Sequence, residues 1–236
     1  MRTDGQIDLA DNKLLATLPG TDRERLRRYL HPVELSFGKV VHEPGTARRN
    51  VYFPVSCVFS KQFLTATGDA AEVASIGNEG MVGIPLLLGC THTPIRTLVQ
   101  VAGSAWCGDS ATMRQEFVRN EALQNVIFRF TQALMTQMGQ NAVCYQRHSV
   151  EQQFCLWLPL MLDRTRSYHL HLTQDLIAHT LGIRRESVNE IISRLARRGV
   201  IRHECGCIEV LDRARLERAS CECYGVINRE YARLLQ

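Results

Sequence analysis

The chain has 236 residues, 45% of them hydrophobic and 22% charged, which suits one or two globular domains and excludes disordered and collagen-like chains. Lysine and arginine exceed aspartate and glutamate by 28 − 24 = 4, a mild positive charge that identifies no partner by itself. Only three of those 28 residues are lysines. The excess of arginine favours recognition of phosphates or guanine edges, although a GC-rich genome predicts the same excess.

The sequence contains no apolar run of about 18 residues, the length that a membrane-spanning helix needs. The first residues, MRTDGQIDLADNK, lack the apolar core of a signal peptide. The nine cysteines are an odd number and lack the spacing of small secreted domains. We therefore expect a cytoplasmic protein with reduced thiols and no membrane partner.

The N-terminal half predicts two short helices and then a series of strands. Residues 11–30 carry leucines at helical spacing, whereas short apolar runs alternate with turns from residue 33 to about 107. Many short, regularly spaced strands predict a sandwich or barrel rather than a parallel sheet. The expected strands are 39–42, 51–53, 58–65, 73–76 and 97–102, with turns at Gly38, Pro44-Gly45, Gly68-Asp69, Gly77-Asn78 and Gly103-Ser104.

A helical pattern begins after Asp109 and includes a long helix over about 121–147. Its apolar residues lie four, three, four and four positions apart, a near-heptad stripe typical of paired helices. A small barrel cannot cover a stripe of this length, so we expect a parallel homodimer along the helix; the alternative is packing against the chain's own barrel. The stripe consists of Leu123, Ile127, Phe130, Leu134 and Met138.

The pattern at 172–211 predicts a winged helix-turn-helix. Thr173 is a good N-cap, Ala178 allows a close helix crossing, and Gly182 suits a tight turn between helices. Apolar residues bury one face of the second helix, which begins near residue 184 and ends near Gly199. Two alternating segments around Cys205-Gly206 then form the wing. A helix-turn-helix places its second helix in the major groove of DNA.

The outer face of the second helix carries the predicted contacts with DNA. Arg185, Glu186 and Asn189 are expected to reach guanine, cytosine and adenine edges, respectively, unless Glu186 only positions Arg185 through a salt bridge. Thr173, Arg184 and Arg194 are expected to contact phosphates. Across residues 164–204, eight arginines outnumber four acidic residues, a local excess that favours a phosphate backbone.

The order of barrel, long helix and winged helix resembles the CRP/FNR family of bacterial transcription regulators. The resemblance covers nearly the whole chain and rests on residues 38–45, 51–54, 76–83 and 173–195. It implies an α+β chain with an N-terminal antiparallel, jelly-roll barrel like that of cyclic-nucleotide-binding domains. The predicted effector domain, 1–148, includes the dimerisation helix, and the DNA-binding domain is 149–236. The resemblance also implies a homodimer on palindromic sites near promoters, where RNA polymerase is the expected partner.

The sequence departs from the cyclic-nucleotide pattern that the resemblance implies. Arg96 and Thr97 match the residues that hold the cyclic phosphate, but Met81 replaces the glutamate that binds the ribose hydroxyl. Met138 and Gly139 fall where adenine-contacting hydroxyls are expected. The pattern therefore argues against cAMP and leaves open another anionic effector or none. The candidate effector-binding residues are Gly80, Met81, Val82, Arg96, Thr97 and Met138.

Metal sites and catalysis have weaker support in the sequence. Cys57 is the first cysteine, which argues against the N-terminal iron–sulfur cluster of oxygen-sensing relatives, and His31, His42 and His92 are unplaced candidates for a haem ligand. We expect no resident cofactor, no metal and no enzymatic activity, because the sequence contains no catalytic motif. The alternative is a metal- or thiol-redox-sensing regulator that uses two C-x-C pairs, Cys205 with Cys207 and Cys221 with Cys223.

Overall fold

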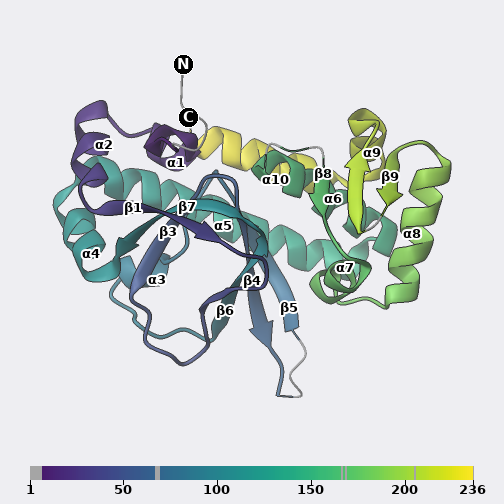
Figure 1. The fold of residues 1–236 in the computed structure, drawn as a ribbon, viewed down its shortest axis with the longest axis horizontal. Helices are drawn as coiled ribbons and strands as arrows, with labels where there is room; N and C mark the ends of the chain where they lie inside the picture. The colour runs from purple at the N-terminus through teal and green to yellow at the C-terminus, as the bar shows by residue number, and fades with distance from the viewer. Residues whose placement is uncertain (1–6, 67–69, 166, 168, 205, 236) are drawn as a thin grey trace.

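The computed structural model describes residues 7–66, 70–165, 167, 169–204 and 206–235. Two β-sheets lie at one end of the molecule and the helix-turn-helix unit lies at the other, with the long helix α5 extending between them (Figure 1). The C-terminal helix α10 packs along α5. No helix in the described ranges combines the length and apolarity needed to cross a membrane.

The N-terminal domain contains a three-stranded sheet of order β1-β7-β3 and a four-stranded sheet of order β2-β6-β4-β5, both antiparallel. Phe53, Phe59 and Trp106 are fully buried in its core. Among the described residues the two sheets are not hydrogen-bonded into the closed barrel that we expected. The strands are β1 (Leu30–Leu35), β2 (Val40–His42), β3 (Asn50–Pro54), β4 (Val58–Leu64), β5 (Ala70–Ile76), β6 (Ile95–Val101) and β7 (Gly103–Asp109).

Five of these strands match the predicted ones, and two were missed. Strand β1 begins at Leu30, where leucine spacing predicted a helix, and β7 begins at the Gly103-Ser104 turn. The signal was weak in β7 because Gly103, Ser104 and Gly108 interrupt its apolar residues. These two strands nevertheless pair with each other over six residues from Leu30 to Leu35. The predicted turn at Gly68-Asp69 lies outside the described residues.

Short helices cover the ends of the sheets, and α5 (Glu121–Arg147) spans the predicted range. The Asn120 side chain caps α5 by accepting a hydrogen bond from the Leu123 amide at 3.0 Å. The other elements before residue 148 are the 3-10 helix η1 (Leu9–Asp11) and α1 (Lys13–Ala16), α2 (Gly20–Arg27), α3 (Ile84–Leu87) and α4 (Ser110–Arg119).

The predicted dimer stripe on α5 lies inside a single chain. Leu123, Ile127 and Phe130 have no exposed surface, and Leu134 is 6% exposed. Met138 is partly buried and packs against the same core. The interface predicted on this stripe is wrong, because side chains that solvent cannot reach in one chain cannot contact a second chain. The stripe packs in the core of its own chain and α10 packs along α5, while another face of the helix stays exposed.

The C-terminal unit contains all the elements of a winged helix and two that the sequence reading did not predict. Strand β8 adds a third strand beside β10, and α10 follows the predicted helix at 213–219. The elements are α6 (Val150–Thr165), β8 (His169–His171), α7 (Gln174–Leu181), α8 (Arg185–Arg197), β9 (Ile201–Glu204), β10 (Cys207–Val210), α9 (Arg213–Ala219) and α10 (Glu222–Leu234).

Candidate nucleic-acid interface and effector site

The helices α7 and α8 form the helix-turn-helix through local interactions that the sequence specifies. The Thr173 hydroxyl accepts a hydrogen bond from the Leu176 amide at 3.2 Å and caps α7. Gly182 ends α7 with φ 65° and ψ 34°, a left-handed conformation in which a Cβ is strained. Apolar side chains then bury the facing sides of the two helices: Ile177, Leu181, Val188, Ile191, Ile192 and Leu195.

The predicted base-reading residues lie together on the exposed face of α8. Arg185, Glu186 and Asn189 are exposed in its first two turns, and Arg184 precedes them as the N-cap residue. Arg185 pairs with Asp175 of α7 at 3.3 Å, and not with Glu186 as the alternative proposed. An exposed ion pair of this kind contributes little to stability, so a base or phosphate can replace Asp175 at low cost.

Arg194 differs from these residues in its surroundings. Its guanidinium pairs with Glu151 of α6, which also binds Arg198 at 3.2 Å. In the structure Arg194 therefore holds α8 against α6. Its side chain is not free to contact a DNA phosphate, as we expected it to be. Arg164 is likewise buried and paired, and Arg166 lies outside the described residues, so the count of eight arginines overstates the charge available to DNA.

The wing is a short antiparallel pair, β9 and β10, that packs beside β8. The Leu172 amide donates to the Gly206 carbonyl at 2.9 Å, which fixes the turn of the wing next to the start of α7. Arg202 and Glu209 form an ion pair across the wing at 2.6 Å. The wing therefore lies beside the end of the helix-turn-helix that carries Thr173.

The comparisons with known proteins agree with this geometry. Residues 152–219 match the family model of the Crp-like helix-turn-helix domain. The fold resembles a transcriptional regulator of the CRP/FNR family from Thermus thermophilus, with a TM-score of 0.63 and 19% identity over 80% of this chain and 98% of that one. No curated protein matched the chain in sequence. The chain has the helix-turn-helix domain and the fold of the CRP/FNR regulators.

Two further solved structures share this fold. FixK2 from Bradyrhizobium japonicum has a TM-score of 0.67 and 12% identity, covering 81% of this chain and 98% of its own. The c-di-GMP-responsive global regulator CLP from Xanthomonas campestris has a TM-score of 0.63 and 13% identity, covering 81% of this chain and 99% of its own. At these identities the likeness extends to the fold and not to the effector.

The predicted effector residues do not form a single site in this chain. Arg96 is held by Glu43 through two hydrogen bonds of 2.8 and 2.7 Å. Met81 is fully buried, and Val82 pairs with Tyr52 across an isolated bridge. Gly80 packs so closely on Phe130 that an added Cβ would lie 2.2 Å from the ring. Of the six candidates, only Thr97 faces the polar interior described next, since Met138 packs on the apolar core.

A row of buried polar residues crosses the inner face of the four-stranded sheet. Thr97 on β6 lies opposite both Lys61 on β4 and His42 on β2. Burial, together with the nearby buried Arg48, lowers the pKa of Lys61 to about 8. Burial, with a smaller effect from Arg48, lowers the pKa of His42 to about 4. Among the described residues, the Arg48 Nε, Thr97 Oγ1 and His42 Nδ1 atoms have no hydrogen-bond partner.

This buried row was missed by the sequence reading because Lys61 and His42 looked like surface residues in isolation. The signal that could have found them is Lys61 itself, a lysine in the middle of the apolar run 58–64. Buried cations with unpaired donors are costly unless an anion joins them. Lys61 and Arg48 are therefore buried, positively charged side chains close to each other, whereas Arg96 is already paired with Glu43.

A polar contact connects the outer face of the same sheet to the helix-turn-helix. The buried Glu72 carboxylate accepts hydrogen bonds from Ser60 at 2.5 Å and Gln100 at 2.8 Å. The Gln100 amide also donates to the Thr180 hydroxyl on α7 at 2.9 Å. Burial raises the pKa of Glu72 to about 7, although these hydrogen bonds oppose the shift. Glu72 therefore titrates near neutral pH at the contact between the two domains.

The Glu72→Gln variant tests this titration. Because the folded pKa is raised from 4.5 to about 7, the carboxyl stabilises the fold most below pH 4.5 and loses that contribution as the pH rises through 7. Glutamine keeps an oxygen that accepts both hydrogen bonds but cannot ionise. We expect Glu72→Gln to raise the free energy of unfolding at pH 8 by up to about 3 kcal/mol, with little effect at pH 5. Urea unfolding at both pH values measures the difference.

The matched control is Glu24→Gln, which removes an exposed carboxylate from α2 in the same domain. It should change stability little at either pH. A Glu72→Gln variant with the same pH dependence as the wild type would show that this carboxyl does not titrate in the expected range.

Proposed function

We propose that the protein is a transcription regulator that binds palindromic promoter sites as a homodimer in the cytoplasm, with an effector other than cAMP or with none. The observation that carries the DNA-binding part is the exposed row of Arg184, Arg185, Glu186 and Asn189 on α8. RNA polymerase is the proposed partner at the promoter. The proposal includes no enzymatic activity.

The base contacts are assigned from side-chain chemistry and position. Arg185 forms two hydrogen bonds with the O6 and N7 atoms of guanine, once DNA displaces Asp175. Glu186 accepts from the cytosine amino group, and Asn189 pairs with the adenine edge. Arg184 and Thr173 contact phosphates at the entrance to the groove.

The Arg185→Ala variant tests this readout. We expect a loss of about 1–3 kcal/mol in DNA binding, or roughly 5- to 150-fold, together with relaxed preference at one base pair in each half-site. Selection of binding sites from random DNA, followed by titration at fixed salt, measures both effects. The matched control is Arg197→Ala, which removes an exposed arginine from the last turn of α8 and should leave the selected sequence unchanged. Retention of the wild-type preference at every position by Arg185→Ala would overturn the assignment.

The proposed dimer interface is the outer face of α5, opposite the stripe that we expected. Residues three and four positions apart on this face are uncharged, and Gly139 has open space around its Cα. Phe128 and Met135 are 52% and 63% exposed, although large apolar side chains favour burial. Small residues beyond them allow two helices to approach closely. The heptad face consists of Asn125, Phe128, Gln132, Met135, Gly139 and Ala142.

The Met135→Glu variant tests this interface. Two glutamates would meet across the two-fold axis of a parallel helix pair, so we expect the dimer to dissociate while the protomer remains folded. Sedimentation velocity and circular dichroism measure these two properties. Leu88→Glu is the control, because Leu88 is 54% exposed and lies outside α5. An unchanged dimer in Met135→Glu, or a wild type that is monomeric, would refute the proposed face.

The choice of effector rests on the pairing of Arg96 and the burial of Met81. A cyclic phosphate would have to displace Glu43 from Arg96, and no carboxylate stands at residue 81 to accept the ribose hydroxyl. We therefore expect cAMP at about 100 μM to leave both the melting temperature and the DNA affinity unchanged. Thermal unfolding and DNA titration with and without cAMP check this result, and saturable cAMP binding by calorimetry would contradict it.

A further inference from the structure

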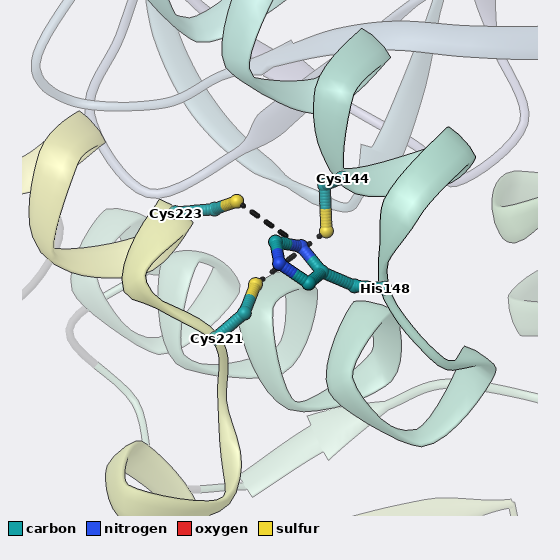
Figure 2. Close-up of side chains that lie close together, drawn as sticks. All are labelled: Cys144, His148, Cys221 and Cys223. Carbon is teal, nitrogen blue, oxygen red and sulfur yellow. Dashed lines mark hydrogen bonds between the residues drawn. The ribbon is translucent and has the colours of Figure 1, made fainter.

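Four metal-ligating side chains meet where the end of α5 approaches the start of α10. Cys144 and His148 lie one helical turn apart on and just after α5, and Cys221 and Cys223 flank the first residue of α10. Figure 2 shows all four side chains directed toward one point. Their sulfur and nitrogen donor atoms lie within 4.8 Å of one another. Cys207 is not part of this group, and Cys205 lies outside the described residues. The candidate metal ligands are therefore not the two C-x-C pairs that the sequence suggested, because only Cys221 and Cys223 belong to both sets.

Two of the distances between these donor atoms match the edges of a tetrahedral metal site. The Sγ atoms of Cys144 and Cys221 are 3.6 Å apart, and Cys223 Sγ lies 3.4 Å from His148 Nδ1. With zinc–sulfur bonds of about 2.3 Å and zinc–nitrogen bonds of about 2.0–2.1 Å, a regular tetrahedron has edges of about 3.8 Å between sulfurs and about 3.5 Å between sulfur and nitrogen. Both observed distances are within about 0.2 Å of these edges.

The surrounding side chains match the outer shell of a zinc site. The His148 Nε2 atom lies 3.3 Å from a Glu222 carboxylate oxygen, so Nδ1 is left to face the cysteines. A carboxylate on the distal nitrogen of a ligand histidine fixes its tautomer and orientation. The Gln140 amide donates to Cys223 Sγ at 3.1 Å, a contact that stabilises a thiolate. Four neutral side chains could pack together without either the Glu222 contact or the Gln140 contact, so both contacts favour a metal site.

The three cysteines of the cluster are closed to solvent, as the ligands of structural metal sites are, and His148 is partly exposed. Cys144 and Cys223 are fully buried, and Cys221 is 6% exposed. Three buried thiolates repel one another unless a cation lies among them. Binding of a divalent ion forms three metal–sulfur bonds and one metal–nitrogen bond and releases three protons to solvent, which leaves a net charge of −1.

We propose that Cys144, His148, Cys221 and Cys223 bind one zinc ion in a closed, structural Cys3His site. Three thiolates and one imidazole are a donor set that zinc favours in structural sites. His148 precedes the segment that matches the Crp-like helix-turn-helix domain, residues 152–219, and Cys221 follows it, so the ion joins the two ends of that segment. It also fixes α10 to the end of α5. A bridge that closes so long a loop stabilises the folded state mainly by restricting the unfolded chain.

The first test is the metal content of the full chain, purified under reducing conditions. We expect about one zinc ion per chain by mass spectrometry, and none in the Cys221→Ser/Cys223→Ser double variant. The control is Cys207→Ser, which removes a thiol from the wing and should keep the full zinc content. This control separates the proposed site from the alternative pairing of C-x-C motifs.

The second test uses the wild-type chain, so that it does not depend on the folding of a variant. X-ray absorption at the zinc edge should require three sulfurs and one nitrogen, and cobalt replacement should give the intense bands of a tetrahedral thiolate site. The Glu222→Gln variant should keep this spectrum and lose about 10- to 100-fold in zinc affinity. Wild-type protein that contains no zinc and gives no such bands with cobalt would overturn the proposal. A Cys144–Cys221 disulfide or an iron chromophore in the purified protein would also overturn it.

Discussion

The buried guanidinium of Arg164 connects the two halves of the molecule. It lies in the last turn of α6 and donates to Glu79 at 2.7 Å, to Ser75 at 2.5 Å and to Gln137 of α5 at 2.9 Å. Loss of one partner of a buried ion pair leaves an uncompensated charge and costs about 3–5 kcal/mol, so this arrangement tolerates little displacement. The chain makes space for it at Gly77, where an added Cβ would lie 2.4 Å from the Arg164 side chain. The position of α6, and with it the helix-turn-helix, is therefore fixed relative to the sheets.

This constraint determines how α5 uses its two faces. The Tyr231 hydroxyl of α10 donates to the same Gln137 oxygen at 2.8 Å, so α10 joins the network and lies against α5. The inner face of α5 is then occupied by the sheets and α10, and its outer face, which carries Phe128, Arg129 and Met135, remains exposed. One helix thus serves the core of the protomer on one side and the proposed dimer on the other. The inner face of α5 is more hydrophobic than the outer face, and it is the face that folding removes from water.

The sequence predicted those features that depend on local patterns. The limits of α5, the Thr173 cap and the left-handed Gly182 follow from short-range rules that act within a few residues. Features that depend on contacts far apart in the chain were not predictable in this way. Cys144 and Cys221 meet only because α10 packs on α5. The spacing of residues in the sequence does not predict that these two helices pack together. Likewise, a heptad pattern shows that a helix has a buried stripe but not whether its own chain or a second chain covers it.

Polar contacts join the four-stranded sheet to the C-terminal unit at two places. The helix-turn-helix contacts the four-stranded sheet through Gln100 and Thr180, and its supporting helix α6 contacts the end of β5 through Arg164. Both contacts belong to the sheet that encloses the buried cations around Lys61. Gln100 lies on β6, the strand that also carries Thr97 of the buried polar row. In a dimer of helix-turn-helix proteins, the separation of the two recognition helices sets the spacing of the half-sites that they bind. The polar contacts between the sheet and the helix-turn-helix therefore hold α6 and α7 in place, and in the proposed dimer they would set the separation of the recognition helices.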